Sequence, residues 1–164
     1  MARCLIVACG CRGLMLAREL RARGHLVRAT TRRPERLPVI EALGAEARLA
    51  DPDRVGTLVP ALEDVTLVYL LLGSAVGSRE QVAALHGPRL QTLLQRMLDT
   101  TVRGIIYEAA GSVEAAVLAA GAALVGSACA GSRIPFALLD SDPREPGCWT
   151  RAAAALAERL LAGG

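Results

Sequence analysis

Short apolar runs alternate with helical patterns along the whole chain. The runs cover residues 4–8, 25–30, 46–50, 66–72, 104–108 and 134–139. Most of them are continuously apolar, which is typical of strands buried on both faces of a parallel sheet. Between them, apolar residues recur at the three- and four-residue spacing of amphipathic helices. The pattern predicts a doubly wound α/β domain with about six parallel strands in the order 3-2-1-4-5-6, the Rossmann arrangement.

Turn residues set the expected ends of the helices. Asp51-Pro52 predicts the N-cap and first residue of a helix that Pro60 should kink or shorten. An alanine-rich helix is expected to begin at Ser112 and to end between residues 121 and 131, and a last helix to cover residues 151–161. Gly24 and Gly44 are expected to follow helices, and Pro34 is expected to begin one. Ser78 and Gln81 predict a capping box for a helical region that reaches Leu98 and is interrupted at Gly87-Pro88.

A glycine-rich turn, Ala8-Cys9-Gly10-Cys11-Arg12-Gly13, separates the first predicted strand from the first helix. The dinucleotide fingerprint G-x-G-x-x-G/A places free backbone N–H groups beside a pyrophosphate. Gly10 and Gly13 match its last two positions, whereas Ala8 replaces the first glycine and is expected to avoid a positive φ. The turn predicts dinucleotide binding. The alternative is an α/β domain that keeps a tight turn and binds nothing there.

The end of the second strand favours NADP over NAD. An NAD-selective site carries Asp or Glu about 20 residues after the glycines, but here no carboxylate occurs before Glu35. Thr31, Arg32 and Arg33 occupy this place, and arginine binds phosphate through two parallel hydrogen bonds. Arg12 could add a further positive charge. The alternative is that Arg32 and Arg33 are solvated charges before the next helix.

The composition excludes several classes of function. The chain has 164 residues, a net charge of +3 and no lysine, so it contains neither a Walker A loop nor a Schiff-base lysine. With 2% aromatic residues and dispersed arginines, nucleic-acid binding is disfavoured. His25 and His86 lack partners at zinc-ligand spacing, so no metal site is expected. No linker or repeat divides residues 1–164, which predicts one domain.

Cysteine usage and hydropathy predict a cytoplasmic protein. The five cysteines show no regular disulfide framework, and no secretory signal precedes the first strand. The most apolar window, residues 115–130, is interrupted by Gly121, Gly126 and Ser127, so that it reads as weakly hydrophobic and no membrane span is expected.

These motifs resemble those of the short-chain dehydrogenase/reductase superfamily, in its atypical NAD(P)H-binding and epimerase/dehydratase-like branch. The resemblance covers nearly the whole chain. It implies that Asp51 lies near the adenine and that Leu72, Gly73 and Ser74 lie along the cofactor. The matching segments are residues 8–13, 30–33, 72–75, 86–90 and 105–110, together with Asp51.

The chain departs from this superfamily at the catalytic positions. Its reductases use Tyr-x-x-x-Lys, which cannot be assembled without lysine, and the catalytic serine position holds Ala109 or Ala110. Glu108 is the best remaining acid/base candidate, because burial at a strand end would raise its pKa. An equal alternative is that Glu108 stabilises the following helix. Tyr107 is a weaker candidate, more typical of packing, and His86 is weaker still.

Cys9 and Cys11 lie at a predicted helix N-terminus, an environment that lowers thiol pKa. They are either redox-active or, more typically, small residues that fill the loop.

Two classes of function remain open. One is an NADPH-dependent reductase that transfers hydride to a small molecule such as a flavin or quinone, which needs cofactor placement more than a dedicated acid. The other is a dinucleotide-sensing module without turnover. A further alternative is a partner-binding domain with a vestigial nucleotide site, and a homo-oligomer is compatible with all three.

Overall fold

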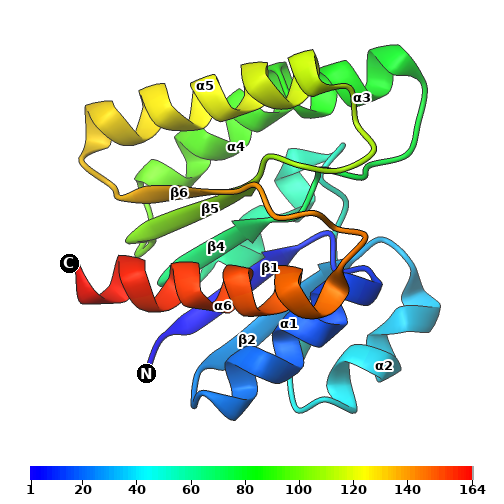
Figure 1. The fold of residues 1–164 in the computed structure, drawn as a ribbon, viewed down its shortest axis with the longest axis vertical. Helices are drawn as coiled ribbons and strands as arrows, with labels where there is room; N and C mark the ends of the chain where they lie inside the picture. Colours follow the sequence, from blue (N-terminus) through cyan, green and yellow to red (C-terminus); the bar gives the residue numbers. More distant parts are fainter. Residues whose placement is uncertain (164) are drawn as a thin grey trace.

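Six parallel strands form one sheet in the computed structural model, which describes residues 1–163 (Figure 1). The strand order is β3-β2-β1-β4-β5-β6, which confirms the order expected from the sequence. The chain therefore reverses its direction of winding between β1 and β4, and in such sheets ligands bind beyond the carboxyl ends of the strands at that point. The strands are β1 (Arg3–Val7), β2 (Leu26–Thr31), β3 (Glu46–Leu49), β4 (Leu67–Leu70), β5 (Gly104–Glu108) and β6 (Phe136–Leu139).

Helices cover both faces of the sheet (Figure 1). One face carries α1 (Cys11–Ala22), α2 (Leu37–Glu41) and α6 (Pro146–Ala162), and the other carries α3 (Arg79–Leu85), α4 (Pro88–Leu98) and α5 (Ala115–Ser132). Successive residues of the central strands enter opposite layers, because strand side chains alternate. Ile6 packs with the α1 and α6 side, whereas Leu5 packs with the α4 side. Two cores result, one on each side of the sheet.

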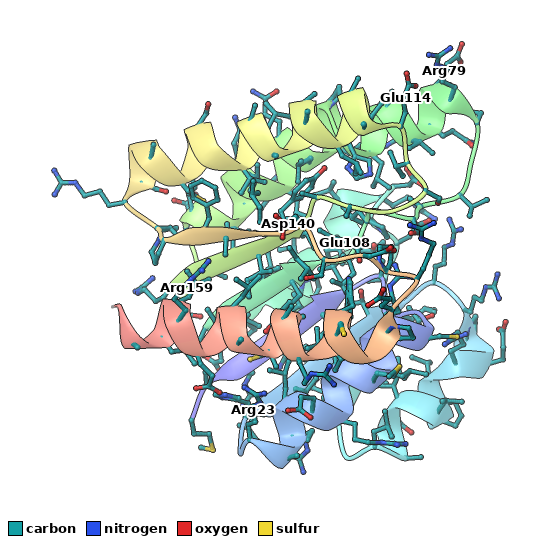
Figure 2. All side chains as sticks on the ribbon, in the orientation of Figure 1. Arg23, Arg79, Glu108, Glu114, Asp140 and Arg159 are labelled. Atoms are coloured by element: carbon teal, nitrogen blue, oxygen red, sulfur yellow. The ribbon has the colours of Figure 1, made fainter. Side chains whose placement is uncertain are left out.

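Charged side chains lie mostly outside these cores. Arg23, Arg79, Glu114 and Arg159 project from the outer surface, whereas Glu108 lies between the layers at the end of β5 (Figure 2). A fully buried carboxylate is unusual unless it is paired. Glu108 is 0% exposed, so its partners require an explanation.

Three predicted helix boundaries were wrong. After Asp51 the chain forms two short 3-10 segments, Val55–Thr57 and Val59–Leu62, instead of an α-helix, because Gly56 and Pro60 oppose helix propagation. Helix α5 begins at Ala115 rather than Ser112 and continues to Ser132. Helix α6 begins at Pro146, a favoured first helical residue, rather than at Arg151.

Helix α5 is more hydrophobic than the glycines that interrupt its sequence led us to expect. It runs unbroken through Gly121 and Gly126, with a mean hydropathy of 1.7 and 22% of its residues buried. By length and composition alone it is long and apolar enough to span a membrane, as are the mostly buried core helices of soluble proteins. Gly121 is required by packing, since a Cβ there would overlap the Tyr107 hydroxyl.

Candidate dinucleotide-binding site

The glycine-rich turn between β1 and α1 is held by β2. The Ala8 amide donates to Thr30 Oγ1 at 3.2 Å, and the Cys9 amide donates to the Thr30 carbonyl at 2.8 Å. Ala8 has φ +60°, so the expectation that it would avoid a positive φ was wrong. The tight turn imposes the glycine-type conformation, and these contacts keep the alanine in it.

We expect Ala8→Gly to raise the free energy of unfolding by about 1 kcal/mol, because glycine adopts φ +60° without the clash that an L side chain meets. Urea denaturation measures the change. A lower stability of the variant would mean that the alanine methyl contributes more through packing than its backbone conformation costs.

The N-terminus of α1 is open to a ligand. Gly10 is its N-cap residue and no side chain caps it. The amides of Cys11, Arg12 and Gly13 belong to the first helical turn, where N–H groups lack partners within the helix. A Cβ built on Gly10 meets no atom within 4 Å, so it would project into open space. Gly13, in contrast, packs closely, because a Cβ there would lie 2.9 Å from Cys9 Sγ.

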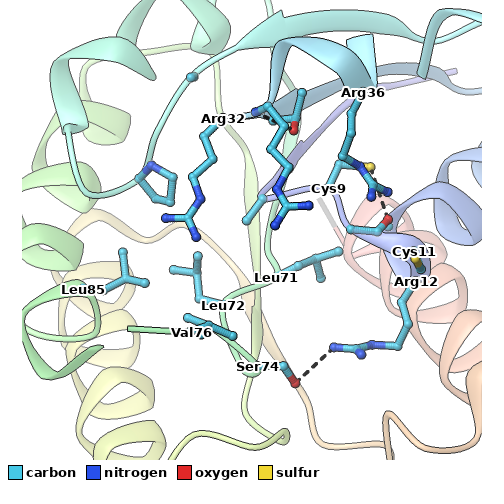
Figure 3. A pocket seen from close by; sticks show the side chains of 18 of the residues that line it. Cys9, Cys11, Arg12, Arg32, Arg36, Leu71, Leu72, Ser74, Val76 and Leu85 are labelled. Atoms are coloured by element: carbon cyan, nitrogen blue, oxygen red, sulfur yellow. Dashed lines mark hydrogen bonds between the residues drawn. The ribbon is translucent and has the colours of Figure 1, made fainter. Parts of the chain in front are cut away.

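A groove of about 530 Å³ lies over this turn (Figure 3). It extends from the end of β2, past the turn, to the segment that follows β4. The structure brings ten of the twelve predicted cofactor residues to this one groove, all but Asp51 and Gly73. The ten that line it are Ala8, Gly10, Cys11, Arg12, Gly13, Thr31, Arg32, Arg33, Leu72 and Ser74.

Asp51 and Gly73 do not line the groove. The Asp51 carboxylate accepts the Asp53 amide at 2.9 Å and shapes the turn, while its neighbours Pro52 and Asp53 face the groove. Gly73 lies behind the groove wall, where a Cβ would overlap the Ala110 carbonyl oxygen.

The groove is positively charged. One side of the groove is lined by Arg32, Arg33 and Arg36, and the other side by Arg12. Asp53 also lines the groove, but its carboxylate is paired with Arg89 at 3.0 Å. Arg36 was not among the predicted residues, although it follows the two predicted arginines by one helical turn. Figure 3 shows the side chains of Arg32 and Arg36 entering the groove.

Two guanidinium nitrogens of this groove have no hydrogen-bond partner. Within residues 1–163, Arg12 Nε and Arg36 Nε are the buried side-chain polar atoms that lack one. A buried donor without a partner costs about 1–3 kcal/mol. Both nitrogen atoms belong to arginines that line the groove, which also contains the uncapped N-terminus of α1. The residues present therefore fit an anionic ligand such as a dinucleotide.

The side chain of Arg12 lies apart from those of Arg32, Arg33 and Arg36. Its Nη2 donates to Ser74 Oγ and Glu108 Oε2, both at 3.3 Å, and its guanidinium carbon lies 5.4 Å from the centre of the Trp149 ring. Arg12 thus lies toward the ends of β4 and β5, whereas Arg32 follows β2 on the other side of β1.

Glu108 is enclosed by donors. Its Oε1 accepts the Gly73 amide at 2.8 Å, and its Oε2 accepts Trp149 Nε1 at 3.1 Å as well as Arg12. Burial raises the pKa of Glu108, as predicted, and the Arg12 guanidinium and the Gly73 N–H counteract part of that increase. Both carboxylate oxygens are occupied, so this side chain connects β4, β5, α1 and α6.

Tyr107 and His86 form a buried pair on the α4 side. The Tyr107 hydroxyl lies 2.5 Å from His86 Nδ1, and His86 Nε2 lies 3.0 Å from the Leu72 carbonyl oxygen. Burial raises the pKa of Tyr107 and lowers that of His86. The two groups satisfy each other away from the groove.

The two cysteines of the turn differ. Burial raises the pKa of Cys9 to about 12, which contradicts the redox-active alternative for this thiol and agrees with the favoured interpretation of a loop-filling residue. Its sulfur packs beneath Gly13 instead, as a small apolar residue would. Cys11 is exposed at the first position of α1.

A family model described as NAD(P)H-binding matches residues 8–159, which contain the glycine-rich turn and the strands from β2 to β6. The chain belongs to the NAD(P)H-binding family. Comparison with curated protein sequences gives no match.

Solved structures share the fold of this NAD(P)H-binding domain at low sequence identity. BdcA from E. coli gives a TM-score of 0.74 at 17% identity, over 95% of this chain and 90% of BdcA. A short-chain dehydrogenase/reductase superfamily protein from Agrobacterium tumefaciens with bound NAD gives 0.68 at 17% identity, over 83% of this chain and 48% of that one. The Citrobacter sp. triphenylmethane reductase complexed with NADP(H) gives 0.66 at 18% identity, over 86% and 49%. The chain spans about half the length of the last two proteins.

Proposed function

We propose that this domain binds NADP(H) in preference to NAD(H) and holds it for hydride transfer to a small molecule. The observation that carries the preference is the cluster of Arg32, Arg33 and Arg36 at the end of β2, with the unpartnered Nε of Arg36 among them. An NAD-type site would place a carboxylate there to hold the ribose hydroxyl. Guanidinium groups match a phosphate instead.

The chain's own residues divide the binding between them. The amides of Cys11, Arg12 and Gly13 and the positive end of α1 would hold the diphosphate. Arg32, Arg33 and Arg36 would hold the 2′-phosphate. When bound, the nicotinamide supplies the hydride. The structurally similar triphenylmethane reductase is complexed with NADP(H), whereas the Agrobacterium tumefaciens protein has bound NAD, so the preference rests on the arginines of this chain.

Arg32→Ala tests the nucleotide preference. We expect the variant to bind NADPH roughly 10- to 100-fold more weakly, because one guanidinium of the phosphate site is lost. NADH affinity should change by less than about threefold, since NADH has no phosphate at this place. Calorimetric titration of both nucleotides provides the measurement, and Arg36→Ala should behave alike. Arg96→Ala, an exposed arginine of α4, is the matched control. Equal losses for both nucleotides would show that Arg32 does not contact the 2′-phosphate.

A sensing module without turnover is the second candidate. It is favoured by the enclosure of Glu108, Tyr107 and His86, none of which is more than 1% exposed. NADPH oxidation with a panel of flavins, quinones and aldehydes separates the two functions, because a sensor binds NADPH without consuming it. A partner-binding domain with a vestigial site would bind neither nucleotide.

We also infer a cytoplasmic location. The described cysteines Cys4, Cys9, Cys11, Cys129 and Cys148 are all free thiols, which supports a reducing compartment.

A further inference from the structure

We propose that the end of the groove beside Arg12 binds the carboxylate of a small anionic substrate. This inference deepens the proposed function, because it assigns a chemical class to the substrate. It concerns Arg12 and Ser74, which lie apart from the arginines that follow β2.

The polar groups at this end offer donors to the groove. Arginine has five N–H donors, and the hydrogen bonds of Arg12 within the described chain all come from Nη2. Its Nη1 donors have no partner in the described chain and are available to a ligand, whereas the unpartnered Nε is buried. Ser74 Oγ accepts from Arg12 Nη2 and from the Ser112 amide at 3.4 Å. With both lone pairs engaged, the Ser74 hydroxyl can only donate to a ligand.

Glu108, whose carboxylate neutralises the charge of Arg12, cannot contact a ligand in the groove. Glu108 is 0% exposed and its two oxygens are already occupied. The Arg12 side chain, in contrast, is 28% exposed and lines the groove. A ligand at this end therefore meets the cation and the hydroxyl without meeting the carboxylate. Such a site selects an anion over a neutral or cationic group.

The guanidinium is also held in place before any ligand arrives. Glu108 fixes one nitrogen and the Trp149 ring supports the guanidinium plane. Holding a side chain in its bound orientation reduces the entropy lost on binding. Apolar residues Leu71, Ala75 and Val76 line the adjoining groove, which suits a carboxylate with an apolar body.

Benzoate and its neutral counterpart benzamide test the site. Trp149 is the single tryptophan of the chain and contacts Arg12, so its fluorescence reports binding there. We expect benzoate to change this fluorescence with saturation, both in the free protein and in protein saturated with NADP⁺, and benzamide to bind at least about tenfold more weakly.

Arg12→Met should weaken benzoate binding at least about tenfold, whereas Arg96→Met leaves it unchanged. Arg12→Met alone leaves Glu108 without its cation, so the variant could fail to fold. The double variant Arg12→Met/Glu108→Gln removes both charges, and its loss of benzoate binding supports the same conclusion.

Three results would overturn the proposal. Equal binding of benzamide would mean that charge is not recognised. Retention of benzoate binding by a folded Arg12→Met variant would place the anion elsewhere. Displacement of benzoate by NADP⁺ would assign Arg12 to the cofactor. A protein that binds benzoate but no NADP⁺ would refute the proposed function and leave the carboxylate site intact.

Discussion

Gly10→Val should weaken NADPH binding roughly 100-fold while lowering the free energy of unfolding by only about 1 kcal/mol, because valine is a poorer N-cap residue than glycine. Gly10 has φ −93°, outside the left-handed region that favours glycine, and a Cβ there touches nothing within 4 Å. The branched side chain would occupy the space above the first turn of α1, where the diphosphate must approach the backbone amides. Calorimetric titration with NADPH and urea denaturation measure the two effects.

Two other glycines serve as controls for this variant. Gly131→Val is the matched substitution away from the groove, since a Cβ on Gly131 in α5 also meets nothing within 4 Å. It should change neither measurement. Gly13→Val should destabilise the fold, because its Cβ would press on Cys9 Sγ. Normal NADPH affinity in folded Gly10→Val would place the nucleotide away from this turn.

The sheet could be predicted because burial leaves a strong signal in the sequence. Strand β5 is apolar from Gly104 to Tyr107 and its predicted bounds match the structure, and the strand order is that expected for right-handed crossovers. The Ser78 capping box was also confirmed, since both of its reciprocal hydrogen bonds with Gln81 are present. These features depend on local periodicity and on residues close in sequence.

The details that could not be predicted depend on contacts between distant segments. Ala8 adopts the positive φ that the first glycine of the fingerprint would supply, although alanine disfavours it, and Thr30 of β2 holds the turn in this conformation. Arg36 enters the groove because a 3-10 turn, Pro34–Arg36, redirects the chain after β2. The pairing of Arg12 with Glu108 joins residues 96 positions apart. Residue spacing carries no signal for such contacts.

Glu108→Ala should lower the free energy of unfolding by about 3–5 kcal/mol, the largest stability effect that we expect in this chain. The substitution leaves the Arg12 guanidinium, the Gly73 amide and the Trp149 indole N–H without their common acceptor. Each lost partner of a buried donor is costly, and a cavity remains where the side chain was. Urea denaturation followed by Trp149 fluorescence gives the measurement.

Glu114→Ala is the matched control, because Glu114 pairs with Arg79 on the surface, where the two side chains are 55% and 85% exposed (Figure 2). Such exposed pairs contribute less than about 1 kcal/mol. Glu108→Gln should fall between the two, because its amide oxygen can still accept the Gly73 N–H while its NH₂ group faces two donors. If Glu108→Ala were as stable as Glu114→Ala, the buried carboxylate would not hold α1 and α6 to the sheet.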